Sequence, residues 1–455
     1  MRDGAERSSI ESDQPDDREG DVNTDTVLIL GLMIVGYTLI SGKLKGSPIT
    51  PAIVFVTVGL LAGPDILDIV DIRVDEGGFQ AAAELALALL LMLQASRIDY
   101  RTASTDLPKR LVAIGLPVMI AAGTAGALLL FPELSFWEAV IAAILVAPAE
   151  AALVAPLVSD RRVPERIRRG FSIESGMGDG LTLGLLLVAL ALASEHNEGN
   201  VSDWLSFVGK SLGMSLVVGG LVGLAGGWLL TTARKAGWVT EIWGQLYLIA
   251  LAPLSFVVVE HLDGSGFVGA FGTGLAFAAV VPNAVERPEG TAEAACELLE
   301  LVVFALFGAA LVYPAFDGVD IEVLVYAVLS LAVFRMLGVA IATARFGFTR
   351  ATRLYMGWFG PRGLASLLLG LLVIDEGVLT NIPLLRDVVV VTVTLSIFLH
   401  GLTGQWATNR YAEIIDGLRR SDPDAPEFAT KAPKGEPATA PVAVPASAPE
   451  SAPVT

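Results

Sequence analysis

Long apolar stretches recur along almost the whole chain, separated by short polar loops. Most are close to the ~20 residues that a helix needs to cross the hydrocarbon core of a bilayer. None alternates apolar and polar residues for long, which argues against a transmembrane β-barrel. The pattern predicts an all-α polytopic membrane protein with thirteen transmembrane helices, at about residues 26–42, 48–64, 78–95, 109–131, 136–158, 171–194, 203–232, 242–260, 264–282, 295–313, 321–345, 355–374 and 386–407.

Composition indicates a membrane domain flanked by two polar ends. Hydrophobic residues make up 53% of the chain and charged residues 17%, against about 45–50% and about 25% in soluble domains. Residues 1–25 are acidic and predict a disordered arm. We expect the transmembrane domain at 26–410 and a cytoplasmic tail at 411–455, which is low-complexity Pro/Ala/Glu-rich sequence from about Ser421. The single cysteine, Cys296, excludes an intrachain disulfide.

Basic and acidic loops alternate between the predicted spans. The basic loops and the C-terminal flank contain Lys43, Lys45, Arg97, Arg101, Lys109, Arg110, Arg161, Arg162, Arg166, Arg168, Arg169, Arg234, Lys235, Arg345, Arg350, Arg353, Arg410, Arg419 and Arg420. The intervening loops contain Asp65, Asp68, Asp71, Asp75, Glu76, Glu195, Glu198, Glu260, Asp263, Asp317 and Asp320. By the positive-inside rule, the chain is a multi-pass protein of the cell membrane with its N-terminus outside and its C-terminus in the cytoplasm.

The formal net charge is -18. Such an acidic chain has little with which to neutralise phosphates, so we expect no nucleic-acid partner. Much of the acid lies in tails and loops, a distribution that suits a high-salt environment and a halophilic source.

Two carboxylates lie in the apolar stretch that begins at Phe171. A charge at membrane depth is costly, so Glu174 and Asp179 are candidate functional residues. Ser175 is four residues before Asp179 and therefore shares its helix face. Glu174 lies roughly 140° around the helix from Asp179 and has a different neighbour. The simpler interpretation, an acid near a helix end that reaches the interface, is weaker for Asp179 because it lies one turn deeper.

Two predicted spans contain helix-breaking sequences. Span five contains Pro148 beside Ala149 and Glu150, and span twelve begins with a glycine-rich segment that includes Gly360, Pro361, Arg362 and Gly363. If spans 1–6 and 8–13 are two repeats, these interruptions occupy matching positions. Interrupted helices at matching positions of two halves indicate a transporter site. An ordinary proline kink is the alternative, more so for Pro148.

Arg335 lies in the middle of span eleven. Its guanidinium cannot lose its charge and needs an anion, for which Glu174 is the natural candidate. This structural ion pair would leave Asp179 as the titrating acid. Glu84 in span three and His400 in span thirteen are interpreted as structural.

These motifs resemble the monovalent cation:proton antiporter family, in its single-aspartate sodium/proton exchanger branch. Residues 174–180, Glu-Ser-Gly-Met-Gly-Asp-Gly, are similar to its Glu-Ser-x-x-Asn-Asp signature. Residues 357–365, Gly-Trp-Phe-Gly-Pro-Arg-Gly-Leu-Ala, look like its glycine-arginine motif and are the more specific match. Segments 264–266 and 398–402 also resemble the family, and the likeness covers roughly residues 26–410.

The resemblance implies two inverted six-helix repeats in which helices 5 and 12 are interrupted and cross. It implies core helices at about 109–194 and 321–407, scaffold and dimer helices at about 26–95 and 203–313, and a homodimer in the lipid bilayer. The core would carry the ion by an elevator-like movement. Asp179 would bind the cation or proton, Ser175 would coordinate the cation, and Glu174 and Arg335 would match the core ion pair. No cofactor is implied; Na⁺ and H⁺ would be transported, or K⁺ or Li⁺ in place of Na⁺.

The sequence departs from the family pattern beside this site. Gly178 stands where the family usually has Asn, and Ala149-Glu150 stands where it usually has Thr-Asp. The usual Asp–Asn contact between helices five and six is therefore absent, and a longer Glu150 facing Gly178 is a paired replacement. We expect electroneutral exchange of one proton for one cation if Asp179 alone titrates. If Glu150 also titrates, two protons per transport cycle become possible.

Three other functions stay open. A K⁺/H⁺ antiporter would have the same architecture. A channel-like or non-transporting sensor of the same fold would signal through the tail. An intramembrane enzyme is least favoured, because the chain has no His-Glu-x-x-His motif and its histidines, His196, His261 and His400, are far apart.

Overall fold

The computed structural model describes residues 24–44, 46–69, 77–96, 106–150, 153, 160–193, 201–281, 290–376 and 379–429. Every regular element in these ranges is helical. The predicted N-terminal arm up to residue 23 and the tail from residue 430 lie outside the described residues.

The first half of the chain begins with three separate helices. They are α1 (Thr24–Leu44), α2 (Pro51–Ala62) and α3 (Gly77–Ser96). A continuous helix follows, formed by α5 (Asp106–Arg110), a π-helical turn (Leu111–Gly115) and α6 (Leu116–Leu130). The half ends with α7 (Phe136–Leu145) and α9 (Glu165–Ala193).

The second half begins with α10 (Val201–Lys235), α11 (Glu241–Glu260) and α12 (Gly266–Val280). Two continuous helices follow, each with a π-helical turn. The first is α13 (Gly290–Phe307), Gly308–Val312 and α14 (Tyr313–Phe316), and the second is α15 (Ile321–Val328), Leu329–Phe334 and α16 (Arg335–Thr343). The last helices are α17 (Arg350–Trp358), α18 (Leu364–Glu376) and α19 (Ile382–Ser421).

Among the described residues, eight helices are long and apolar enough to cross a membrane, and five shorter apolar helices accompany them. Each of the thirteen predicted stretches overlaps at least one of these helices, whereas the number of crossings stays a prediction.

The π-helical turns have two origins. Two of them end two residues before a proline, Pro117 in α6 and Pro314 in α14, where the missing N–H disrupts regular helical bonding. The third, Leu329–Phe334, has no proline and comes directly before the buried Arg335. Widened turns of this kind are frequent at functional sites.

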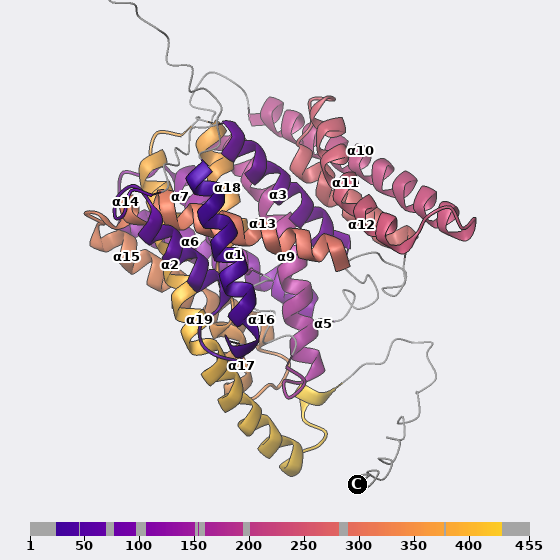
Figure 1. Ribbon diagram of the computed structural model, residues 1–455. Coiled ribbons are helices and arrows are strands. Elements are labelled where there is room, and N and C mark those ends of the chain that lie inside the picture. The colour runs from indigo at the N-terminus through magenta and orange to yellow at the C-terminus, as the bar shows by residue number, and fades with distance from the viewer. Residues whose placement is uncertain are drawn as a thin grey trace, which may run out of the picture.

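Helices α10, α11 and α12 lie side by side at one side of the molecule (Figure 1). Helix α12 also contacts α3, and α13 contacts α2. Helix α6 packs on α7 and α16, α7 on α9, and α19 contacts α15, α17 and α18. The division into scaffold and mobile core is not tested by these contacts and stays a prediction.

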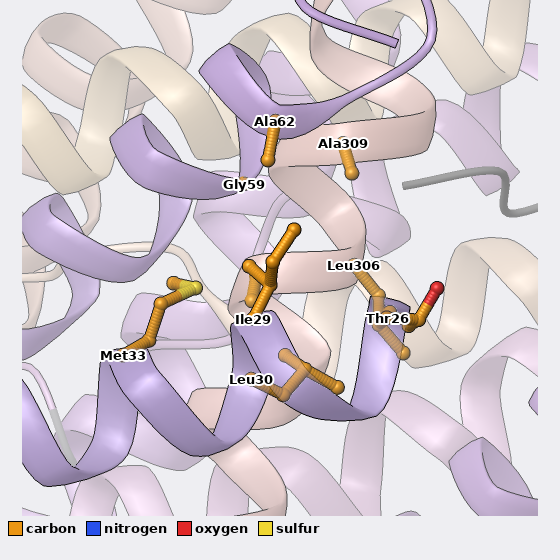
Figure 2. A pocket seen from close by; sticks show the side chains of 9 residues that line it. Thr26, Ile29, Leu30, Met33, Gly59, Ala62, Leu306 and Ala309 are labelled. Carbon is orange, nitrogen blue, oxygen red and sulfur yellow. The ribbon is translucent and has the colours of Figure 1, made fainter. Parts of the chain in front are cut away.

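Helix α1 touches the rest of the protein along one edge only. Ile29, Leu30 and Met33 face a small apolar crevice of about 10 Å³ against α2 and α13 (Figure 2). Its other side exposes Val27, Leu28, Leu32, Val35 and Leu39. An exposed apolar surface of this kind is favourable only against lipid tails or a partner helix.

Glu138 joins the start of α7 to the connection before α19. Ser135 caps α7, and Glu138 completes the capping box by accepting from the Ser135 N–H. Its carboxylate also accepts from the backbone N–H groups of Thr380 and Asn381 and from the Asn381 amide. The start of α7 is thus tied to the segment before α19.

The C-terminal boundary differs from the prediction. The tail was placed from residue 411, but α19 continues to Ser421. The chain then turns back through a short 3-10 helix, Pro426–Phe428, in which Glu427 is fully buried. Sequence composition did not reveal this because the buried contacts come from distant segments.

Candidate functional site

Two helix breaks meet inside the protein. Helix α7 ends at Leu145, and Val146–Glu150 has no helical structure. Helix α17 ends at Trp358, and α18 begins only at Leu364. The Glu150 N–H donates to the Pro361 carbonyl at 2.8 Å, so the two breaks contact each other directly.

Glycine is required where the breaks are closest. A Cβ on Gly363 would lie 2.9 Å from the Glu150 Cγ, and a Cβ on Gly360 would collide with the Arg335 guanidinium. A larger residue at Gly363 would push the two breaks apart, and one at Gly360 would displace Arg335. The predicted helix-break residues Pro148, Gly360, Pro361, Arg362 and Gly363 all lie in this contact region.

Arg362 bridges the two breaks. Its Nη1 donates to the carbonyl of Pro148 at 3.3 Å and to that of Gly360 at 2.9 Å. The side chain is 1% exposed. Carbonyls freed at helix C-termini have partial negative charge, so a buried guanidinium compensates both interrupted helices at once.

Glu150 belongs to the first break, and its side chain lies at the N-terminus of α18. Its Oε2 accepts from the Ala365 N–H at 3.1 Å, and the residue is 1% exposed. A carboxylate at a helix N-terminus is stabilised by the partial positive charge there.

Ser175 connects α9 to the first break. Its hydroxyl donates to the Ala149 carbonyl at 2.7 Å. Both residues are buried. Because the Ser175 hydrogen is used in this bond, the lone pairs of its oxygen remain available to a cation.

Asp179 lies one turn further along α9 and is 2% exposed. The Gln94 amide of α3 approaches its carboxylate, while neither oxygen completes a hydrogen bond of normal geometry with a described residue. The acidic groups of Glu150 and Glu300 are close enough to repel a charge on Asp179. Since buried polar groups are rarely left unsatisfied, this carboxylate remains the candidate for binding a proton or a cation.

Glu174 and Arg335 form a buried bidentate ion pair. Arg335 Nη1 bonds Glu174 Oε1, and Nη2 lies 3.0 Å from Oε2. Nη2 also donates to the Phe359 carbonyl, the first residue after α17, at 3.4 Å. The pair therefore links α9 and α16 to the second break.

His400 of α19 fixes the same break from another side. Its Nε2 lies 2.9 Å from the Trp358 carbonyl, and its Nδ1 lies 3.2 Å from the Ser396 hydroxyl. The Ser396 oxygen in turn accepts from the Arg362 N–H at 2.6 Å. The Nδ1 also lies 2.9 Å from the Ser396 carbonyl. His400 therefore ties α19 to the end of α17, in agreement with its interpretation as a structural residue.

Sequence reasoning missed three neighbours of the site: Gln94, Glu300 and Ser396. Glu300 could have been found by the rule that singled out Asp179, because it also lies in an apolar stretch. Gln94 and Ser396 gave no signal, since uncharged polar residues are common in helices. Among the described residues, no three His, Cys, Asp or Glu side chains form a group that could hold a metal ion.

Comparison with known proteins gives consistent matches. The family model for transmembrane sodium/hydrogen exchangers matches residues 29–410. The K(+)/H(+) antiporter NhaP of Alkalimonas amylolytica is 23% identical over 354 residues, covering 76% of this chain and 60% of that protein. The K(+)/H(+) antiporter NhaP2 of Shewanella sp. ANA-3 is 25% identical over 265 residues, covering 55% of this chain and 44% of that protein. The chain thus spans about half the length of these relatives.

The structure is similar to that of the sodium proton antiporter MjNhaP1 from Methanocaldococcus jannaschii. The TM-score is 0.68 at 19% identity, and the match covers 85% of this chain and 98% of that one. The likeness extends to the fold of nearly the whole archaeal chain.

Proposed function

Since this chain belongs to the transmembrane sodium/hydrogen exchanger family, we propose that it exchanges Na⁺ for H⁺ across the cell membrane, with Asp179 as the binding residue. The observation that carries the proposal is the 2% exposed Asp179 carboxylate beside two crossing helix breaks. An acid this deep in an apolar protein needs either a proton or a cation to balance it.

The cation would be bound by oxygen atoms. Asp179 supplies the charge, the Ser175 oxygen supplies free lone pairs, and the Ala149 carbonyl supplies a further acceptor at the break. Hard cations prefer oxygen ligands of this kind. Unwound backbone at membrane depth is tolerated where it forms such a site.

Exchange would follow from competition at Asp179. The carboxylate binds either H⁺ or the cation, and only the charge-compensated form crosses at low cost. With one titrating acid the exchange is one for one and electroneutral. We propose that α6, α7, α9 and α15–α19 move as a body against α2, α3 and α10–α13 in an elevator-like step, within a homodimer.

A cavity of about 60 Å³ lies on the side of the basic loops. Thr50, Asp160, His400, Gly404 and Thr408 are among its lining residues. We propose that ions enter here, because the lining residue His400 also contacts the second helix break. Hydrogen bonds from the Arg162 side chain hold the pKa of Asp160 below its usual value, so Asp160 stays ionised in its pair with Arg162.

K⁺/H⁺ exchange is the second candidate. It is favoured by the two bacterial relatives, which are K(+)/H(+) antiporters by name. A non-transporting sensor is the third possibility, and the unusual Gly178 and Glu150 keep it open. Ion flux distinguishes all three.

The test is proton flux in sealed vesicles that contain the purified protein and a pH-sensitive dye. We expect Na⁺ to drive H⁺ movement more effectively than K⁺ or Li⁺, each added in turn. Asp179→Asn should abolish the flux while its melting temperature stays close to that of the wild type, because the amide fills the same space without binding a proton or a cation strongly.

Asp317→Asn is the matched control, since Asp317 is exposed between α14 and α15. Its flux should equal that of the wild type. Normal exchange in Asp179→Asn would refute the assignment of Asp179. Larger flux with K⁺ would replace the Na⁺ proposal with the second candidate, and a wild type inactive with every cation would favour the sensor.

A further inference from the structure

The segment after α19 returns to the helix bundle and docks on it. Asp422–Ala429 turns back through the short helix Pro426–Phe428. Ala425 is 2% exposed and Glu427 is 0% exposed. This segment lies beyond residue 410, where the family match ends.

Glu427 binds the N-terminus of α17. Its Oε1 accepts from the Thr349 N–H at 2.8 Å and from the Thr352 hydroxyl at 2.9 Å. Thr349 is the N-cap residue, and its side chain accepts from the Thr352 N–H. In a capping box, the residue at the third helical position supplies the acid that binds the N-cap N–H. Here that position holds Thr352, and the acid comes from Glu427, 78 residues away from Thr349.

The first turn of α17 needs this distant acid. It contains no acidic residue and begins with Arg350, whose charge is unfavourable at the positive end of a helix. A buried carboxylate there satisfies a free backbone donor and compensates the helix dipole.

Further contacts hold the docked segment in place. The Pro426 carbonyl accepts from Arg166 of α9 at 2.6 Å. The Arg419 guanidinium lies 4.9 Å from the centre of the Phe428 ring. Phe428 packs against the apolar cluster around Ile167, Met356 and Ile415. The segment is therefore anchored on both α9 and α17.

Helix α17 connects this docking point to the helix break. It has nine residues, a length of about 13 Å. At its other end, the Trp358 carbonyl is bonded to His400, and the Phe359 carbonyl accepts from Arg335. A change in the first turn of so short a helix displaces the carbonyls at its end.

We propose that Glu427 is a positioning residue for transport: by capping α17 from a distant part of the chain, it fixes the second helix break and thereby the cation site. Only the transport measurement of this inference rests on the proposed function. The structural measurement, the exposure of the α17 amides to hydrogen exchange, is independent of transport.

The experiment compares full-length protein with Glu427→Ala and with two shortened chains. One chain stops after Ala429 and loses only residues 430–455, and the other stops after Ser421 and also loses the docked segment. Glu413→Gln, an exposed acid on α19, is the control for a surface charge. Hydrogen–deuterium exchange at residues 349–353 and the KM and maximum rate for the cation are measured for each.

We expect exchange at residues 349–353 to become about fivefold faster in Glu427→Ala and in the chain ending at Ser421, as for loss of a helix cap. KM should rise severalfold, with a maximum rate within about twofold of the full-length value. Glu427→Gln should retain most of the amide protection and most of the cation affinity, because its amide oxygen can still accept the two hydrogen bonds. The chain ending at Ala429 and Glu413→Gln should match the full-length protein.

Unchanged hydrogen–deuterium exchange at residues 349–353 in Glu427→Ala would overturn the capping role. Faster hydrogen–deuterium exchange with an unchanged KM would overturn the positioning role. A lower maximum rate with an unchanged KM would overturn it too, because that result indicates only a smaller folded fraction. If the full-length protein transports nothing, the proposed function fails, while the exchange measurement still decides whether Glu427 caps α17.

Discussion

The Glu174–Arg335 pair shows what a single residue type can predict. A guanidinium in mid-span cannot become neutral, so its presence at position 335 already required a buried anion. The structure brings Glu174 to it with two bonds and buries both side chains. Its role as a structural pair, rather than a participant in transport, can be tested by stability.

Removing one partner of the pair should destabilise the folded protein far more than removing both. Arg335→Ala leaves an unpaired buried carboxylate, which costs about 3–5 kcal/mol and should lower the melting temperature sharply. In a cycle with Glu174→Gln and Arg335→Gln, the double variant should be more stable than the sum of the single losses predicts, as measured by thermal unfolding in detergent. Strictly additive losses would contradict the pair.

Two residues that sequence could not place, Gln94 and Ser396, are uncharged and make contacts between distant elements. Gln94 reaches Asp179 from α3, and Ser396 binds the Arg362 N–H from α19. Such contacts depend on the register between helices, which hydrophobic periodicity does not define. Glu174, Asp179 and Arg335 were predictable because burial of an ion is costly, although the same rule was not applied to Glu300.

Among the elements, the two helix breaks were predictable and the bonds between them were not. Pro148 and the glycines near Pro361 mark the interruptions directly in the sequence. The pairing of carbonyls with donors depends on how the two segments cross. The hydrogen bonds of Arg362 and Glu150 could therefore be identified only from the structure. The docked segment at Glu427 was missed because composition cannot show a contact between distant parts of the chain.

Helix α18 provides an element-level test through Glu150. Glu150→Gln should keep most of the exchange activity, because its amide oxygen can accept from the Ala365 N–H as the carboxylate does. Glu150→Ala should destabilise the protein by about 1 kcal/mol or more, the typical effect of losing a helix cap, and should weaken exchange. Thermal unfolding and vesicle flux give the two measurements.

Glu165→Gln, a partly exposed acid in the first turn of α9, is the matched control. Flux measured with a clamped membrane potential distinguishes the capping role from a titrating role. Wild-type exchange that depends on potential, with a dependence that disappears in Glu150→Gln, would show that Glu150 carries a second proton.

At the scale of the whole molecule, the alternation of basic and acidic loops defines an orientation. The chain has one cysteine, Cys296, and it is 7% exposed. A Cys296→Ala parent therefore allows single reactive cysteines to be placed on either side of the membrane. The exposed positions Asp317 and Asp424 lie on opposite sides in the predicted topology.

We expect a membrane-impermeant maleimide to label Asp317→Cys in intact cells. Asp424→Cys should be labelled only after permeabilisation, because its loop is cytoplasmic in the predicted orientation. The Cys296→Ala parent without an added cysteine sets the background. The opposite labelling pattern would invert the topology and would place the cavity near Asp160 on the outer side.

The distance in sequence between Glu174 and Arg335 has a consequence for how the protein is made. The two partners are 161 residues apart, and ribosomes add about 5–20 residues per second. Glu174 is therefore synthesised roughly 8 to 30 s before Arg335. Until then Glu174 lacks its partner, and an acid at membrane depth is costly, so we expect α9 to be held at the edge of the translocation machinery. Membrane integration of this half of the chain is therefore completed only when α16 arrives.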